Sequence, residues 1–148
     1  MVHLHQLPAH LRDALVHEEL PEYGDTPWVD PRPLAESRVA LISTAGLHRR
    51  EDSPFTSRSG DYRIIPDDYD MNRLTMSHLS TNYDRTGFYQ DLNTAFPIDR
   101  LRELAADGTI GSVAGRHYSF MGATPPTVME PVARDLAKVL KADKVDAV

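Results

Sequence analysis

The sequence has 148 residues, a formal charge of −6 at neutral pH and no cysteine. Without a thiol, these residues provide no disulfide, no thiolate metal site and no cysteine nucleophile. The excess of acidic residues argues against a nucleic-acid partner. No apolar run is long enough to span a membrane, and the first ten residues lack the basic and then apolar pattern of a secretory signal. We therefore expect a globular, cytoplasmic protein with one main domain.

Residues 1–37 have the pattern of an N-terminal arm. A helix starting near Pro8 is predicted by five apolar residues at helical spacing, namely Leu7, Leu11, Ala14, Leu15 and Leu20. A proline-rich segment follows, with Pro21, Pro27, Pro31 and Pro33. Because tryptophan carries a large apolar surface, we expect Trp28 to pack over its own domain or over a partner subunit.

The second part, residues 38–148, begins with the nearly continuous apolar run from Arg38 to Thr44. Such a run is typical of a strand that is buried on both faces of a parallel sheet. Gly46 then allows a sharp turn. In open α/β sheets, ligands bind beyond the carboxyl ends of the strands, so His48 is expected at the mouth of a site.

Further strands and helices follow in alternation. The patterns predict short strands over 61–65 and 73–78, an irregular segment over 79–95, a helix over 98–105 that ends at Gly108, and an extended segment over 110–120. The irregular segment is either functional, mobile or plain surface.

The last part of the sequence predicts a second helix and the start of another strand. Thr124 has the chemistry of a helix N-cap, and two prolines suited to a first turn come directly after it. Residues 144–148 resemble a strand onset. Together the elements predict an α/β fold class with a mostly parallel, Rossmann-like or flavodoxin-like sheet, flanking helices and an incomplete C-terminal side.

Two histidines are candidates for acid–base or anion-binding work, because imidazole titrates near neutral pH. They are His48 and His78, and the alternative for each is an ordinary hydrogen-bonded histidine beside a loop. His48, His78 and His117 each follow or end a strand-like segment, so they could converge. The arm histidines have a spacing that matches no recognised set of metal ligands: His3, His5, His10 and His17. Without cysteine or an H-E-x-x-H pattern we expect no metal site, and a metal-dependent enzyme built on His48, His78 and His117 is the weaker alternative.

Other polar residues are candidates for substrate binding. Arg63 and Arg116 could hold a carboxylate through paired hydrogen bonds, or could form surface ion pairs. Asp91, Asn93 and Asp99 could form a polar site, although Asn93 also suits a turn and Asp99 suits the start of a helix. Ser43 lacks the strained setting of a hydrolase nucleophile.

Several ordered blocks resemble the selenoprotein B subunit of the glycine/sarcosine/betaine/D-proline reductases, and the D-proline reductase branch most closely. These blocks are 38–48, 60–66, 77–78, 91–93, 96–101, 108–111, 120–122 and 145–148. The resemblance implies an α/β fold and a reductive cleavage of a carbon–nitrogen bond. In that family a selenolate or thiolate attacks the substrate, and a pyruvoyl-bearing partner holds the amine in several members.

The resemblance also places a selenocysteine or cysteine shortly after the block at 145–148. The expected cofactors, selenocysteine or cysteine and a pyruvoyl group, would then lie on a missing segment or a partner. The sequence thus leads to two hypotheses. The chain is a component of a reductase complex for a small amino-acid substrate, inactive alone and part of a homo- or hetero-oligomer, or it is a non-catalytic interaction or scaffold subunit.

Overall fold

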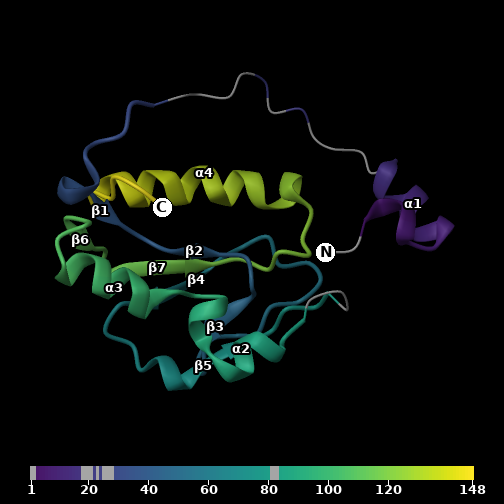
Figure 1. Cartoon of the computed structure of the whole chain (residues 1–148), viewed down its shortest axis with the longest axis horizontal. Coiled ribbons are helices and arrows are strands. Elements are labelled where there is room, and N and C mark those ends of the chain that lie inside the picture. The colour runs from purple at the N-terminus through teal and green to yellow at the C-terminus, as the bar shows by residue number, and fades with distance from the viewer. Residues whose placement is uncertain (1–2, 18–21, 23, 25–28, 81–83) are drawn as a thin grey trace.

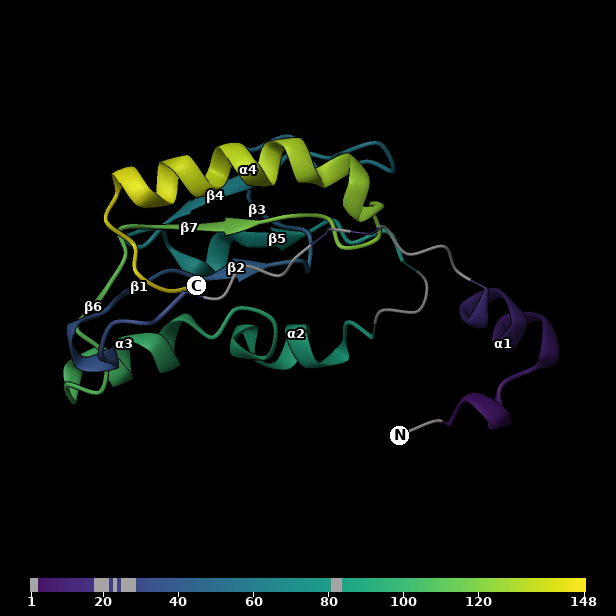
Figure 2. The ribbon, with the colours of Figure 1, turned by 90° about the horizontal axis from the view of Figure 1, so that it is seen from above.

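The computed structural model describes residues 3–17, 22, 24, 29–80 and 84–148. Short strands form a central layer, as Figures 1 and 2 show. Helix α4 (Pro126–Ala142) covers one face, while α2 (Thr86–Gln90) and α3 (Ile98–Ala106) lie on the other. The α/β class expected from the sequence is therefore confirmed.

Two parallel ladders form the centre of this layer. Strand β1 (Arg38–Val39) pairs with β6 (Ser112–Val113), and β2 (Ile42–Ser43) pairs with β7 (Arg116–Ser119). Between the ladders, two residues of one chain segment oppose four of the other, so the apolar run forms two short strands instead of one. The Leu41 amide, left without a ladder partner, donates to Nδ1 of His117 at 2.9 Å.

The remaining pairings are antiparallel. Strand β4 (Arg63–Pro66) runs against β7, and β3 (Leu47–Arg49) runs against β5 (Leu74–Met76). The sheet is thus mixed, which corrects the expectation of a mostly parallel one. An apolar run predicts a buried strand, but it carries no information about the direction of its neighbour. The predicted burial on both faces is also wrong at Ile42, which is 38% exposed.

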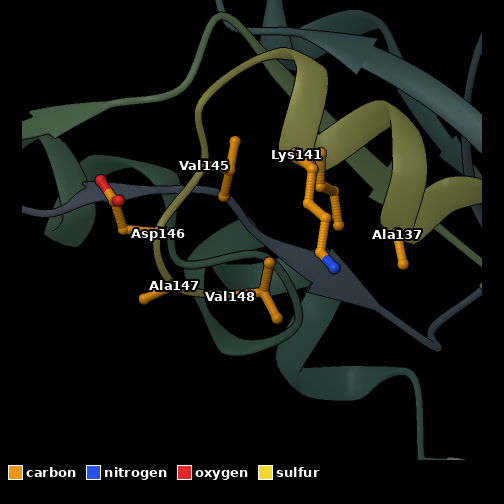
Figure 3. A pocket seen from close by; sticks show the side chains of 7 residues that line it. Ala137, Lys141, Val145, Asp146, Ala147 and Val148 are labelled. Carbon is orange, nitrogen blue, oxygen red and sulfur yellow. The ribbon is translucent and has the colours of Figure 1, made fainter. Parts of the chain in front are cut away.

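The C-terminal residues join the sheet on the far side of β1. The Ala40 amide donates to the Ala147 carbonyl, and the Asp146 amide donates to the Arg38 carbonyl. Val39 and Ala147 form a parallel bridge, as the predicted strand onset requires. Beside this segment, α4 and residues 145–148 line a shallow groove, shown in Figure 3.

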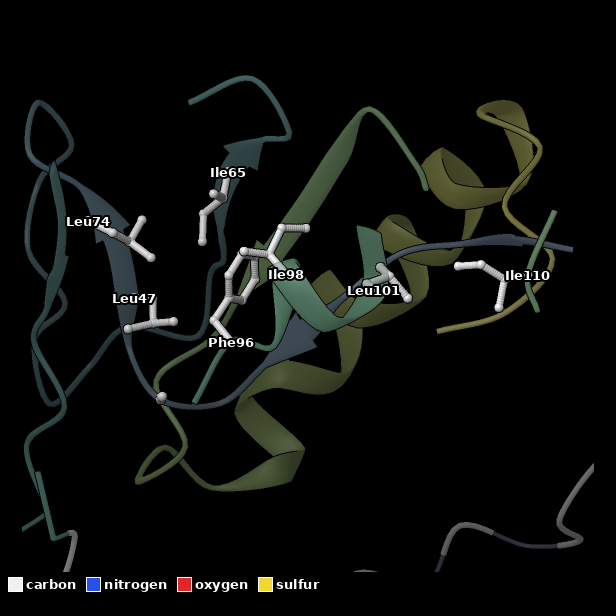
Figure 4. Close-up of a cluster of buried hydrophobic side chains, with 8 residues drawn as sticks. Leu47, Ile65, Leu74, Phe96, Ile98, Leu101 and Ile110 are labelled. Atoms are coloured by element: carbon white, nitrogen blue, oxygen red, sulfur yellow. The ribbon is translucent and has the colours of Figure 1, made fainter. Parts of the chain in front are cut away.

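Two apolar clusters hold the layers together. The larger lies between the strands and α3, and Figure 4 shows its members Leu47, Ile65, Leu74, Phe96, Ile98, Leu101 and Ile110. The smaller contains Tyr118 and Phe120 from β7 and its extension, packed against Leu136 of α4. Burying side chains of this size contributes about 1.5–3 kcal/mol each, so the larger cluster stabilises the fold most.

The helix boundaries follow local chemistry. Gly108 adopts a φ of +79° just beyond Asp107, the C-cap of α3, as predicted for a stop. Thr124 does not cap α4, because its hydroxyl donates to the Ser59 carbonyl instead. Pro125 and Pro126 provide the start of the helix, and Pro131 lies inside it. None of the described helices combines the length and the apolar character needed to cross a bilayer.

The segment predicted to be irregular contains two short helical elements, α2 and the 3₁₀ helix η4 (Leu92–Thr94). They were missed because a five-residue helix shows too little periodicity to detect. Three further 3₁₀ turns connect other elements: η1 (Leu4–Gln6), η2 (Leu34–Glu36) and η3 (Met71–Arg73).

In the arm, α1 (Ala9–Val16) starts directly after Pro8, as the sequence predicts, and lies apart from the sheet (Figures 1 and 2). Its Leu11 and Leu15 are exposed. Leu20 and Trp28 lie outside the described residues, so the packing expected of Trp28 stays a prediction. The same holds for the boundary between residues 37 and 38.

Candidate functional site

The turn between β2 and β3 brings three distant segments together. Gly46 has a φ of +66°, and a Cβ there would lie 3.0 Å from the amide nitrogen of His78. Its own amide donates to the Phe120 carbonyl, and its carbonyl accepts from the Ser77 amide. Only glycine combines this conformation with so close an approach. The turn therefore joins the ends of β2, β5 and β7 at one corner of the molecule.

His48 is buried at this corner, in β3, instead of at the open mouth that the sequence suggested. Its Nδ1 lies 2.8 Å from the Arg49 carbonyl, and its Nε2 lies 2.6 Å from the Ser77 hydroxyl. Because a carbonyl only accepts, Nδ1 carries the hydrogen and Nε2 accepts from Ser77. Thr75, opposite His48 in the ladder, places its hydroxyl 3.1 Å from Nδ1.

Arg63 is linked to His48 through an aromatic ring. Its guanidinium stacks 4.4 Å from the centre of the Phe55 ring, and that ring meets the His48 imidazole edge-on at 6.3 Å. Arg63 also donates to Asp61 at 2.6 Å and to the Ser53 carbonyl at 3.0 Å. A substrate carboxylate would therefore compete with Asp61 for this guanidinium.

We call the group formed by His48, Phe55, Arg63, Thr75 and Ser77 the His48 cluster. One nitrogen of the His48 imidazole accepts from a hydroxyl, and a carbonyl holds the other. This arrangement orients the ring to exchange a proton with the hydroxyl. The arrangement can thus relay a proton between Ser77 and His48.

His78 lies next to the cluster but belongs to a different environment. The Ser80 amide donates to its Nδ1 at 3.2 Å, and Arg85 donates to its carbonyl. Burial, and then the positive charge of Arg85, lower the pKa of His78 below its usual value. His78 is therefore neutral at pH 7 and can accept a proton there.

Asp91, Asn93 and Asp99 do come together, as the sequence suggested, and we call them the Asn93 cluster. The Asn93 side-chain amide donates to Asp91 at 2.9 Å and to Asp99 at 3.0 Å, and its carbonyl oxygen accepts from the Asp99 amide at 3.1 Å. The Asn93 backbone amide and side chain lower the pKa of Asp91. These contacts close η4 onto the start of α3, and all three residues are at the surface.

Arg116 and His117 lie elsewhere. Arg116 is paired with Asp143, just after α4, at 2.6 Å. His117 is fully buried, and its Nε2 has no hydrogen-bond partner among the described residues, with Asp67 3.6 Å away. Burial lowers the pKa of His117. The part of the chain that the structure describes contains no group of three metal-ligand side chains.

Sequence reasoning missed Phe55, Thr75 and Ser77. Thr75 and Ser77 are alternate residues at the end of a short strand, so their side chains lie on one face. Pairing that strand with β3 would have placed them next to His48. Phe55 lies in a charged loop and gave no comparable signal.

Comparison with known proteins adds the context for this corner. Residues 19–148 match the family model described as glycine/sarcosine/betaine reductase selenoprotein B. The chain is 36% identical over 119 residues to the D-proline reductase subunit gamma of Acetoanaerobium sticklandii, which covers 78% of this chain and 48% of that protein.

Two more distant relatives are subunits of glycine reductase complexes. The glycine reductase complex component B subunit gamma of Symbiobacterium thermophilum is 28% identical over 136 residues, covering 87% of this chain and 32% of that protein. The corresponding subunit of Carboxydothermus hydrogenoformans is 30% identical over 130 residues, which cover 81% of this chain and 30% of that protein. The chain thus spans about half or a third of the length of these relatives, and no solved structure matches it. It belongs to the glycine/sarcosine/betaine reductase selenoprotein B family.

Proposed function

We propose that this chain forms one side of the active site in a reductase complex, and that the selenocysteine or cysteine nucleophile comes from polypeptide outside these 148 residues. The observation that carries the proposal is the family match over residues 19–148 in a sequence without any cysteine. The proposed reaction is the reductive cleavage of a carbon–nitrogen bond in a small amino-acid substrate of the proline, glycine, sarcosine or betaine type. Its proposed location is the cytoplasm.

The chemistry makes two demands on the protein. When the nucleophile attacks carbon, the electrons of the broken carbon–nitrogen bond go to nitrogen, which then takes a proton unless it is already quaternary. The release of the product consumes two electrons, which thiols supply as they form a disulfide or a selenium–sulfur bond. An external thiolate or selenolate meets the second demand, and a proton donor on this chain can meet the first.

The His48 cluster supports the role of proton donor. The Ser77 hydroxyl lies 2.6 Å from Nε2 of His48, so it can give its proton to the leaving nitrogen while it takes one from Nε2 of a doubly protonated His48. His78 is a candidate for a different part of the proton exchange, because its lowered pKa suits a proton acceptor rather than a donor to the leaving nitrogen. A pyruvoyl carbonyl on a partner subunit would hold the substrate amine.

Substrate binding is assigned by proximity to this cluster. Arg63 stacks on the same ring that contacts His48, so it is the proposed partner for a substrate carboxylate. Asp91, Asn93 and Asp99 remain candidates for the amine side, because the carboxylates of Asp91 and Asp99 are exposed and the pKa of Asp91 is lowered by its hydrogen bonds from Asn93.

Reconstitution tests the proposal. The purified chain is combined with a selenocysteine- or cysteine-bearing subunit of such a complex and a dithiol, and D-proline, glycine, sarcosine and betaine are supplied separately. We expect cleavage of one substrate class, measured by mass spectrometry of the product, and none without the chain. Ser77→Ala should lower kcat about 10²-fold, the usual size of a general-acid contribution, and His10→Ala should not change it.

A stable complex with no turnover of any of the four substrates would contradict the proposal. It would favour the alternative of a non-catalytic scaffold subunit. Turnover that is equally fast without the chain would have the same meaning.

A further inference from the structure

The backbone groups of the first parallel segment point alternately to two sides. The carbonyls of Ser37, Val39, Leu41 and Ser43 accept from amides of the segment that contains β6 and β7. In a strand, the amide and carbonyl of one residue face the same side and those of the next residue face the other. Arg38, Ala40 and Ile42 therefore turn their backbone groups to the opposite side.

On that side the backbone pairing covers β1 and stops before β2. The Arg38 carbonyl and the Ala40 amide bond to Asp146 and Ala147. No residue that the structure describes bonds to the Ala40 carbonyl or to the backbone groups of Ile42 on this side. Ala40 is fully buried, so its carbonyl is shielded from bulk water. A buried carbonyl without a partner is costly and rare in folded proteins.

The direction of the missing partner follows from the pairs already made. Residues 146–147 run parallel to β1, and Val148 continues toward β2 with 69% of its surface exposed. In the same register, a residue two positions after Ala147 would donate to the Ala40 carbonyl and accept from the Ile42 amide. The residue two positions further on would donate to the Ile42 carbonyl.

The space beside this edge suits the side chains of such a strand. The groove has a volume of about 210 Å³, and Ala137, Leu140 and Lys141 of α4 form one wall, with residues 145–148 along the other (Figure 3). Ala137 and Leu140 make that wall largely apolar, and Ile42 is an exposed apolar residue of the edge strand β2. Small or β-branched apolar side chains are the ones that pack on such a surface.

We propose that the free edge of β2 is the docking site for an extended segment of the polypeptide that lies outside these 148 residues and runs parallel to β2. The curated relatives support this occupant, because more than half of each of them lies outside its match with this chain. The inference rests on the proposed function, in which outside polypeptide completes the active site. A strand parallel to β2 would run toward the turn at Gly46, the corner of the molecule that holds the His48 cluster.

Hydrogen exchange at single amides tests the proposal. Two extended forms of the full chain are compared with the chain itself: one carries Thr-Val-Thr-Val-Thr after Val148, and the other carries the same five residues with proline at the first and third positions. At those two positions the backbone amides would donate to the Ala40 and Ile42 carbonyls, and proline has no amide hydrogen to donate. We expect the first extension to slow exchange of the Ile42 amide at least about tenfold. The proline form should leave it unchanged.

The amides of Tyr118 and Phe120, which bond inside the sheet, serve as controls for an intact fold in all three proteins. Equal exchange at Ile42 in both extended forms would overturn the proposal. So would protection in the unextended chain that grows with protein concentration, because a second copy would then occupy the edge. The measurement uses no substrate or reductant, so a failed reductase assay would leave its result intact.

Discussion

The His48 cluster and the Asn93 cluster differ in how the chain builds them. The His48 cluster is partly buried and joins β3, β4, β5 and the loop before β4, with contacts between residues up to 29 positions apart. The Asn93 cluster is exposed, and its members are at most eight positions apart. The comparison shows that polar residues of similar types can either tie distant segments together or finish the end of one helix.

The largest expected effect comes from the turn that positions the His48 cluster. Gly46→Val places a β-branched side chain at positive φ, with its Cβ about 3.0 Å from a backbone nitrogen. We expect the free energy of unfolding to fall by about 3 kcal/mol, the upper part of the range for such strain. Urea denaturation measures it. Gly24→Val is a matched control, because a Cβ at Gly24 meets nothing within 4 Å. Equal losses in the two variants would show that contact at the corner plays no part.

The histidine of the cluster comes next. His48→Phe removes both ring nitrogens and leaves the Ser77 hydroxyl and the Arg49 carbonyl without this partner. We expect a loss of about 2 kcal/mol, the middle of the range for unpaired buried groups. His10, which is exposed, should tolerate alanine within about 0.5 kcal/mol. A loss at His48 no larger than at His10 would mean that the cluster adds nothing to stability.

His117 is buried but belongs to neither cluster, so it shows how burial of a histidine affects the pH dependence of stability. Burial lowers the pKa of His117 in the folded state, so the unfolded chain binds a proton more readily. Stability should therefore be full above pH 6.5 and fall as the pH drops below that value, by at most about 1.4 kcal/mol per pH unit. His78, with a lowered pKa as well, contributes with the same sign.

His117→Asn checks this assignment, because its side-chain oxygen can still accept from the Leu41 amide. We expect the variant to lose part of the pH dependence in thermal melts between pH 5 and 7.5. An unchanged slope would assign the pH dependence to other groups.

The smallest effect is expected at the Asn93 cluster. Asn93→Ala removes the acceptor of the Asp99 amide at the start of α3. The loss should be about 1 kcal/mol, as for other helix caps. Asn93→Asp keeps that acceptor and should recover part of the loss, limited by repulsion from Asp91 and Asp99. If the alanine variant instead cost more than His48→Phe, the contrast between the clusters would be reversed.

The sequence predicted elements wherever one pattern persisted. The stripe of Ile98 and Leu101 and the stop at Gly108 sufficed for α3, and the turn at Gly46 was clear from glycine alone. Directions of strands were not predictable, because β4 and β7 show the same apolar pattern whichever way they run. The Asn93 cluster was found because its residues are close in sequence. The partners of His48 were missed because they depend on the pairing of β3 with β5.

The position of β7 in the sheet has a consequence for how the molecule forms. The hydrogen bond between Leu41 and His117 lies between the two parallel ladders and joins residues that are 76 positions apart in the sequence. Strand β4 also pairs with β7. Closing so long a loop precedes any gain from the contact, which slows folding. During synthesis, β2 and β4 leave the ribosome long before β7, the strand that both of them pair with. We therefore expect the chain to reach its fold late, after residue 119 has emerged, with apolar strands exposed until then.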